Sequence, residues 1–289
     1  MNKYEDRIRK NKIIRRRNRV VMVAFLVIVF SWAFFIGTKL ASRKTSLLSS
    51  SNIVGEGKST KQNSEVAKDT LHKRFTTSQP PGEYKPWKVK RKDGKKVAYL
   101  TFDDGPSPNN TPQVLKILKE NDIKATFFLI GKNAGANKDL VKQEVKEGHV
   151  VANHTYSHKL GYREDPSAFV DDVNRCDLIL KAILGRDYNL KLLRFPGGSF
   201  NTASLNMEPF KKAITEEGYH YVDWNDWIGD ASGNDLPVWN LMNELKKYTT
   251  NDTVVILMHD AAAKTTTVRA LPEVIQYLKS NGYTFETLN

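Results

Sequence analysis

The sequence has almost no cysteine: Cys176 is the only one in 289 residues. No disulfide can therefore form within the chain. Cys176 lies in a stretch that is expected to be helical, and we interpret it as a small, semi-buried apolar residue. The chain also has no short repeat period, which argues against a solenoid. Because 40% of the residues are hydrophobic, a globular domain with a sizeable core is expected.

The folded part of the chain lacks a basic excess, although the formal net charge is +13. Residues 97–289 contain 21 Lys/Arg and 25 Asp/Glu, whereas residues 1–19 contain nine basic and two acidic residues. An enzyme that acts on nucleic acid more often carries a basic stripe on its folded domain. The charge distribution therefore argues against nucleic acid as a partner.

Residues 20–38 contain no charged side chain. As a helix, these 19 residues would span about 28 Å at about 1.5 Å per residue, which matches a bilayer core of about 30 Å. The basic residues are denser before the segment than after it, which predicts a cytoplasmic N-terminus and an extracellular remainder. A cleaved signal peptide is the alternative, but its apolar region is usually shorter and a small-residue cleavage site follows it. We expect an uncleaved anchor.

These patterns divide the chain into four segments: a basic cytoplasmic tail (1–19), a transmembrane helix (20–38), an extracellular stalk (39–88) and a catalytic domain (89–289). The stalk is rich in Ser, Thr, Lys and Gly and has no sustained apolar period, as in a flexible linker. Its positive charge suits an anionic surface, either lipid headgroups or an acidic cell wall. A charge run is nevertheless more often a solvated linker.

Short apolar runs alternate with helical patterns from residue 97 onward. Several helical patterns end in glycine just before the next run, as at Gly148, Gly218 and Gly282, where a left-handed C-cap is expected. The seven candidate strands are residues 97–102, 125–130, 149–153, 191–195, 220–224, 253–258 and 283–286. The alternation predicts an α/β fold, a distorted (β/α) barrel with about seven parallel strands.

Ionisable side chains follow five of these strands. In such folds, chemistry takes place just beyond the carboxyl ends of the strands, so we expect these side chains to meet. They are Asp103 and Asp104 after the first strand, His154 after the third, Arg194 at the end of the fourth, Asp230 in the loop after the fifth, and His259 after the sixth.

His154 and His158 are four residues apart, on one face if the segment is helical. With a carboxylate from elsewhere they would form a His-His-Asp site that suits zinc or another late first-row divalent metal. Two solvated histidines are the alternative. Asp103 and Asp104 lie where a strand breaks, so their side chains diverge and one can reach a metal while the other faces substrate. A surface Asp-Gly turn would explain the aspartates alone.

Five motifs in this order and spacing resemble the NodB-homology domain of the polysaccharide deacetylases, carbohydrate esterase family 4. They are TFDDGP (101–106), NHTYSH (153–158), RFPGGS (194–199), the region of Asp223 and Trp224, and LMHD (257–260). The resemblance covers about residues 95–289. With an anchor and a stalk upstream, the chain is similar to Gram-positive cell-surface peptidoglycan N-acetylglucosamine deacetylases.

The resemblance implies one divalent metal ion, zinc with cobalt or nickel as alternatives, held by Asp104, His154 and His158. It implies that Asp103 is the general base and that Arg194 pairs with it and orients it.

The resemblance also implies that His259 protonates the leaving amine and that Asp230 keeps His259 cationic. The backbone N–H of Gly197 would stabilise the oxyanion, and Leu257 would line the pocket for the acetyl methyl group.

Two departures from the family pattern affect these roles. Gly197 stands where family members often have tyrosine, and loss of that ring would open one side of the substrate site. The fourth motif is irregular, so Asp226 competes with Asp230 as the partner of His259. Trp224 and Trp227 would wall the pocket or stack on a sugar ring, although core packing explains Trp224 as well.

The function expected from these features is hydrolytic removal of N-acetyl groups from a cell-surface glycan, with the N-acetylglucosamine of peptidoglycan as the first choice. The alternatives are the same chemistry on N-acetylmuramic acid, chitin-like oligomers or an exopolysaccharide, and an esterase acting on O-acetyl groups. A catalytically silent glycan-binding protein is the alternative from another class.

Overall fold

The computed structural model describes residues 75–77, 79–162 and 165–288. The expected cytoplasmic tail, membrane helix and first part of the stalk lie outside these residues. Within the described ranges, no helix is both long enough and apolar enough to cross a bilayer.

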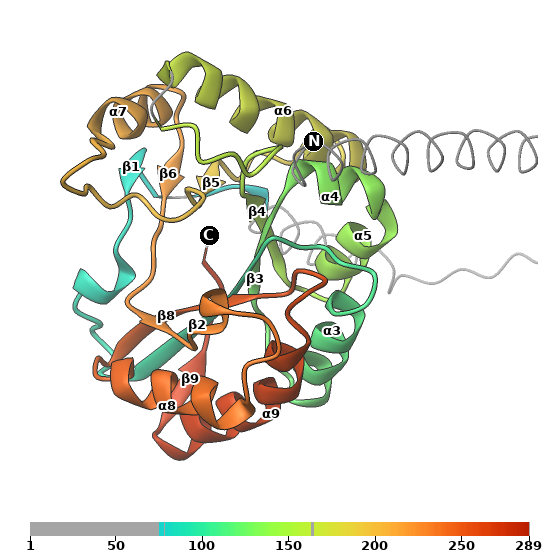
Figure 1. Cartoon of the computed structure of the whole chain (residues 1–289), viewed down its shortest axis with the longest axis vertical. Coiled ribbons are helices and arrows are strands. Elements are labelled where there is room, and N and C mark those ends of the chain that lie inside the picture. The colour runs from blue at the N-terminus through green and yellow to red at the C-terminus, as the bar shows by residue number, and fades with distance from the viewer. Residues whose placement is uncertain (1–74, 78, 163–164, 289) are drawn as a thin grey trace, which may run out of the picture. The chain divides into compact units, whose positions relative to one another are not determined.

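The described residues contain one sheet of nine strands, and its neighbouring strands pair in parallel (Figure 1). The strands are β1 (Gly82–Glu83), β2 (Lys96–Asp103), β3 (Thr126–Leu129), β4 (Val150–Asn153), β5 (Leu192–Leu193), β6 (His220–Tyr221), β7 (Asp226–Trp227), β8 (Thr253–His259) and β9 (Tyr283–Phe285). Their order is β1-β6-β5-β4-β3-β2-β8-β7, with β9 beside β2. No pairing within the described part of the chain joins β7 to β1, so the curled sheet stays open.

Strand β2 is the longest strand of the sheet, and it pairs with three others. It pairs with β8 along nearly its whole length, from Val97 opposite Thr253 to Asp103 opposite His259. On its other edge, β9 pairs with the first residues of β2 and β3 with the last. The register of β2 and β8 therefore brings Asp103 and His259 to the same edge of the sheet.

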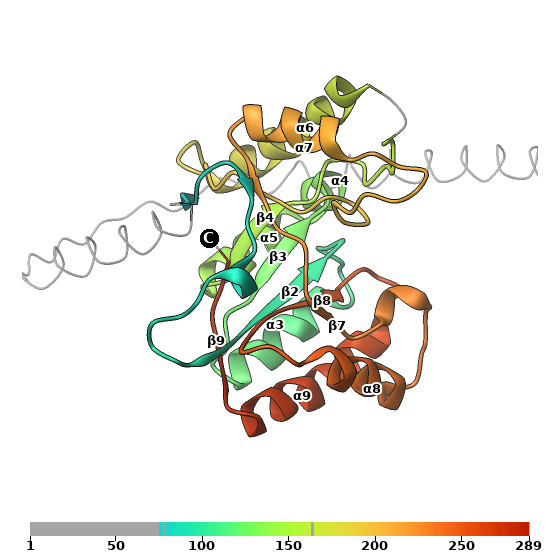
Figure 2. The same ribbon diagram turned by 90° about the vertical axis from the view of Figure 1, so that its left-hand side faces the viewer.

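Helices surround the sheet, and two groups of them are visible in Figure 2. The helices are η1 (Pro86–Lys88), α3 (Thr111–Glu120), α4 (Gly131–Ala136), α5 (Lys138–Lys146), α6 (Pro166–Leu184), α7 (Glu208–Glu216), η2 (Asp230–Ser232), α8 (Val238–Tyr248) and α9 (Thr265–Ser280). Helix α9 contacts α3 and α8 at one end of the described domain, whereas α6 contacts α4 and α7 at the other.

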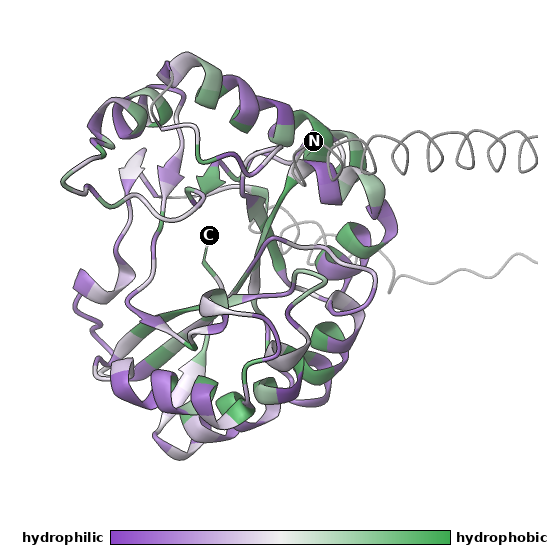
Figure 3. Ribbon diagram, in the orientation of Figure 1, coloured by the Kyte–Doolittle hydropathy of each residue, from purple (hydrophilic) through white to green (hydrophobic). Residues whose placement is uncertain are grey.

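The core forms because each element buries an apolar face. In α9, Val268, Leu271, Ile275 and Leu278 are buried at the three- and four-residue spacing of an amphipathic helix. The central strands are hydrophobic and the outer faces of the helices hydrophilic (Figure 3). Cys176 lies within α6 and is fully buried, deeper than the semi-buried position expected for it.

All seven expected strands are present, with bounds that differ by a few residues. The expected glycine caps are confirmed by the positive φ angles of Gly148, Gly218 and Gly282, which are 95°, 82° and 81°. The sequence analysis did not predict β1 and β7, because a strand of two residues is too short to show an alternating or apolar pattern. Strand β1 pairs with β6, although its residues lie in the range 39–88 that is expected to be stalk.

Candidate active site

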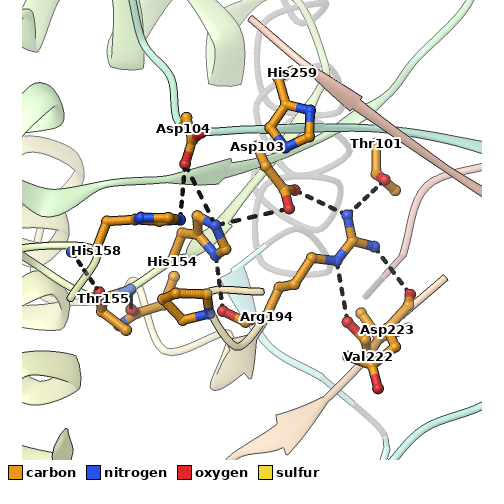
Figure 4. Close-up of polar contacts among 12 residues, drawn as sticks. Thr101, Asp103, Asp104, His154, Thr155, His158, Arg194, Val222, Asp223 and His259 are labelled. Atoms are coloured by element: carbon orange, nitrogen blue, oxygen red, sulfur yellow. Dashed lines mark hydrogen bonds and ion pairs between the residues drawn. The ribbon is translucent and has the colours of Figure 1, made fainter. Parts of the chain in front are cut away.

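Asp104, His154 and His158 come together beyond the ends of β2 and β4 (Figure 4). Asp104 Oδ1 lies 3.2 Å from His158 Nε2 and 3.6 Å from His154 Nε2. One ligand atom from each residue lies within 4.8 Å of the other two. The sequence analysis predicted this grouping. Residues 154–158 form no helix, however, so helical spacing is not what places the two histidines together.

A tight turn, rather than a helix face, brings the two histidines together. Thr155 and His158 have φ angles of 63° and 55°, in the left-handed region. Asn153 Oδ1 accepts a hydrogen bond from Thr155 N at 2.8 Å, and Thr155 Oγ1 accepts one from His158 N at 3.0 Å. Asp172 accepts hydrogen bonds from the backbone N and hydroxyl of Ser157. Side chains that bond to nearby backbone in this way stabilise turns.

The three side chains fit a divalent metal. His154 Nδ1 lies 2.8 Å from the carbonyl oxygen of Arg194, which can only accept, so Nδ1 carries the proton. Burial lowers the pKa of His154 to about 3, although Asp104 opposes this shift, and the ring is neutral. Its Nε2 lone pair therefore faces Asp104 Oδ1, a buried oxygen that accepts no hydrogen bond from any described residue. Two hydrogen-bond acceptors that face each other repel unless a cation lies between them. A hydrogen bond from the other ring nitrogen to a backbone carbonyl oxygen is typical of metal-bound imidazole.

Asp103 is buried next to this cluster and is held by Arg194. Its Oδ1 accepts a hydrogen bond from Arg194 Nη1 at 2.9 Å, while its Oδ2 lies 3.7 Å from His154 Nε2. Burial raises the pKa of Asp103, and the charge of Arg194 opposes the increase. One carboxylate oxygen is thus fixed, and the other faces the metal-ligand cluster.

The guanidinium of Arg194 is fully buried and is bonded on every side. Besides Asp103, it donates to Thr101 Oγ1 at 2.7 Å and to the carbonyl oxygens of Val222 and Asp223, each at 3.1 Å. Its centre lies 4.1 Å from the middle of the Phe128 ring. These contacts fix the orientation of Arg194 and, through it, that of Asp103.

His259 forms a second ion pair, with Asp230. His259 Nδ1 lies 2.9 Å from Asp230 Oδ1, and Asp230 Oδ2 accepts hydrogen bonds at 2.8 Å from His259 N and from Thr267 Oγ1. Burial lowers the pKa of His259, but Asp230, helped by Asp103 and Asp104, outweighs it and raises the pKa to about 9. His259 is therefore an imidazolium at neutral pH, with Nε2 unused by any hydrogen bond among the described residues.

Asp226 and Asp230, the two candidate partners of His259 in the fourth motif, have different contacts in the structure. Asp226 accepts hydrogen bonds from Thr249 Oγ1 and from Trp227 N, both at 2.7 Å, and has no bond to His259. Asp230 is the carboxylate beside His259. The sequence alone did not point to Thr101 or Thr267, because an isolated threonine gives no signal of the carboxylate or guanidinium it will meet.

The remaining expected site residues lie around this centre. Leu257 is two residues before His259 on β8 and so faces the same side of the sheet, and Trp227 on β7 is its register partner. The ring of Trp227 packs edge-on against Tyr248 at 5.8 Å. Gly197 is exposed, with a φ angle of 76°, and its N–H donates no hydrogen bond to another described residue.

Comparisons with known proteins agree with these motifs. The family model described as polysaccharide deacetylase matches residues 90–213. A peptidoglycan-N-acetylglucosamine deacetylase of Bacillus cereus is 35% identical over 227 residues, which cover 76% of this chain and 80% of that protein.

Two solved structures are also similar. A carbohydrate esterase family 4 (CE4) esterase of Streptococcus mutans has a TM-score of 0.63 and 32% identity, covering 68% of this chain and 87% of that one. A polysaccharide deacetylase of Bacillus cereus has a TM-score of 0.61 and 36% identity, covering 68% and 93%.

Proposed function

Because this chain belongs to the polysaccharide deacetylase family, we propose that it is a metal-dependent hydrolase that removes N-acetyl groups from a glycan, with the N-acetylglucosamine of peptidoglycan as its substrate. One observation carries the proposal: the Asp104–His154–His158 cluster lies beside a buried carboxylate and, one strand away, a cationic histidine. The site thus offers a metal position, a base and an acid. The name of the Bacillus cereus relative supports the choice of glycan.

The reaction needs a polarised carbonyl, a deprotonated water and a protonated leaving group. A divalent metal bound by Asp104, His154 and His158 would supply positive charge that polarises the acetamide carbonyl and acidifies water. Asp103 takes the proton of the attacking water at Oδ2, since Arg194 engages Oδ1.

His259 completes the hydrolysis. As the carbon–nitrogen bond breaks, His259 gives its Nε2 proton to the nitrogen, which leaves as an amine, and the acetyl group leaves as acetate. The exposed N–H of Gly197 is free to donate to the oxyanion, and Leu257 and Trp227 line the position of the acetyl methyl group.

Acetate release tests this function. The full-length chain, purified in detergent and supplied with zinc, cobalt or nickel, is expected to release acetate from N-acetylglucosamine oligomers and from peptidoglycan. Comparison with O-acetylated and N-acetylmuramic acid substrates identifies the bond and the sugar. If metal is bound and no acetylated glycan releases acetate, the protein is not a glycan deacetylase, and the silent glycan-binding alternative is the one to test.

Replacing Asp230 with asparagine is expected to move the alkaline limb of the pH profile of kcat/KM to lower pH. His259 acts in its protonated form, so the rate falls as pH rises through its pKa of about 9. Without the carboxylate, burial lowers that pKa, and we expect a shift of about one pH unit or more. A metal ion bound nearby lowers the pKa of His259 in the wild-type protein and in the Asp230 variant alike. The measurement is therefore the difference between their two pH profiles.

Asp226→Asn is the matched control for this prediction. Asp226 is buried like Asp230 but bonds to Thr249 instead of His259. The alkaline limb should therefore stay in place. A shift in the Asp226 variant and none in the Asp230 variant would mean that Asp226 is the residue that acts on His259.

We also propose that residues 20–38 hold the enzyme in the cell membrane with its catalytic domain outside. The uncharged segment and the denser basic flank before it support this orientation. Protease added to intact protoplasts is expected to remove the catalytic domain and to spare a tag at the N-terminus. A protected catalytic domain, or a chain released into the medium, would contradict the proposal.

A further inference from the structure

A short loop that leads into β2 carries a dense positive charge. Residues 88–96 contain five lysines, one arginine and one aspartate, and we call this segment the lysine loop. Its five lysines are exposed, and none of them forms an ion pair with another residue that the structure describes. Residues 97–289, by contrast, contain more acidic than basic residues. The lysines are therefore available to a partner outside the domain.

Arg91 holds the lysine loop in place. Its guanidinium donates two hydrogen bonds to Asp93, at 3.0 and 2.9 Å, and two to Glu286 after β9, at 3.1 and 2.9 Å. Such forked pairing of arginine with a carboxylate fixes geometry as well as adding energy. Glu286 also accepts a hydrogen bond from the Tyr99 hydroxyl at 3.1 Å. The loop is thus fixed while its lysines stay exposed, so a partner that binds them has little backbone to order.

A second group of lysines lies at the same edge of the sheet. Four lysines and two acidic residues line a groove between α3 and α5. Lys119 and Lys146 lie in the last turns of these helices, and Lys124 precedes β3. Strands β2 and β3 are parallel, so the residues before them lie at one edge of the sheet, where the strands begin. We call this groove and the lysine loop together the basic edge.

The basic edge and the catalytic centre lie at opposite ends of the strands. The lysine loop is at the tail of the β2 arrow in Figure 2, and Asp103 is the last residue of the same strand. The eight residues of β2 span about 26 Å at about 3.3 Å each. A surface that binds the basic edge therefore leaves the catalytic centre uncovered.

Two features favour a lipid surface as the partner of the basic edge. Val89 is 61% exposed between Lys88 and Lys90, and an apolar side chain flanked by lysines suits the boundary between headgroups and acyl chains. Residues 39–74, which separate the expected membrane segment from the described domain, would span at most about 120 Å when fully extended. A bilayer that holds residues 20–38 therefore stays within reach, and tethering lets a weak attraction suffice.

We propose that the basic edge docks on anionic phospholipid headgroups of the membrane that holds the anchor. The lysine ammonium groups are attracted to the headgroup phosphates, as lysines close to an anionic bilayer are, and Val89 enters the headgroup boundary. Because the catalytic centre lies at the other end of the strands, docking turns it away from the bilayer and toward the cell-surface glycan. The inference rests on the proposed membrane anchor, and it gives the anchored domain an orientation.

A dye at position 89 tests the docking. Val89→Cys in the full-length protein is labelled with a dye whose emission shifts to the blue in an apolar environment, and the protein is reconstituted in lipid nanodiscs. Cys176, the other cysteine, is fully buried and stays unlabelled. The blue shift is expected in discs that contain phosphatidylglycerol and not in discs of phosphatidylcholine alone. Salt at about 1 M should reverse the shift, because the Debye length falls to about 3 Å.

Removal of charge from the lysine loop should abolish the docking. The loop variant combines Lys88→Gln, Lys90→Gln and Lys92→Gln. It should lower the equilibrium constant for docking by about 100-fold. The matched control removes three lysines from α4 and α7, outside the basic edge: Lys132→Gln, Lys211→Gln and Lys212→Gln. The control should dock like the wild-type protein.

Three results would overturn the proposal. They are an equal blue shift in neutral and anionic discs, a shift that survives in the loop variant, and the absence of a shift in anionic discs. If the dye responds only to soluble poly(glycerol phosphate), the basic edge binds an anionic polymer instead of lipid, and the proposal is wrong in its partner.

Incorporation into neutral discs separates this inference from the proposed anchor. If the protein does not incorporate, the anchor fails, and the labelled chain is then mixed with phosphatidylglycerol vesicles. Salt-sensitive binding that the loop variant lacks would still support the docking surface. No binding, or equal binding by both proteins, would refute it.

Discussion

Asp103→Asn is expected to lower kcat on an acetylated oligomer by about 10²–10⁴-fold while leaving the metal bound. An asparagine has nearly the same shape and can still accept the hydrogen bond from Arg194 Nη1. It cannot take a proton from water, so the step that needs a base is lost. The measurement is kcat together with the metal content of the purified protein.

Asp104→Asn provides the contrast. Asp104 Oδ1 faces both His154 and His158, so the neutral amide should weaken metal binding first and activity as a consequence. Excess metal should then restore part of the activity of the Asp104 variant and none of that of the Asp103 variant. If Asp103→Asn loses its metal and Asp104→Asn keeps it, the two aspartates have the opposite roles.

His154→Ala is expected to have the second large effect, a loss of metal affinity of more than about 100-fold with a matching loss of activity. Removal of an outer hydrogen-bond partner of a metal ligand typically costs 10–100-fold, and removal of a ligand should exceed that. The carbonyl oxygen of Arg194 holds His154 Nδ1, so that Nε2 faces Asp104, and the alanine variant loses this ligand atom. Metal titration and acetate release measure the two effects.

His220→Gln is the matched control, because His220 is equally buried but lies on β6, outside the metal-ligand cluster. It should retain metal and activity even if its thermal stability falls. Unchanged metal affinity in His154→Ala would remove His154 from the ligand set.

The strands and the residues that follow them could be predicted because parallel strands in this fold are continuous apolar runs. Asp103 and His259 illustrate the point. Each ends a run of buried residues, and both runs belong to neighbouring parallel strands, so their meeting follows from the topology. The family motifs added the roles, which apolar patterning cannot supply.

Two features of the site could not be predicted from the sequence, because they depend on contacts between segments that are far apart in the chain. The turn at residues 154–158 is held by Asn153 and by Asp172, which lies on a helix more than a dozen residues later. The choice between Asp230 and Asp226 rests on which carboxylate faces β8, and both fit the spacing.

The hydrogen bonds of Arg194 should delay the recovery of activity when the protein refolds. Its guanidinium joins Thr101 and Asp103 on β2 to Val222 and Asp223 after β6, and it lies just after β5 itself. Strand β2 lies about 90 residues before β5 and still further before β6 in the sequence, so the base is positioned only after all three strands have docked. Recovery of acetate release should therefore lag behind recovery of helical signal, and a partly assembled chain should be inactive.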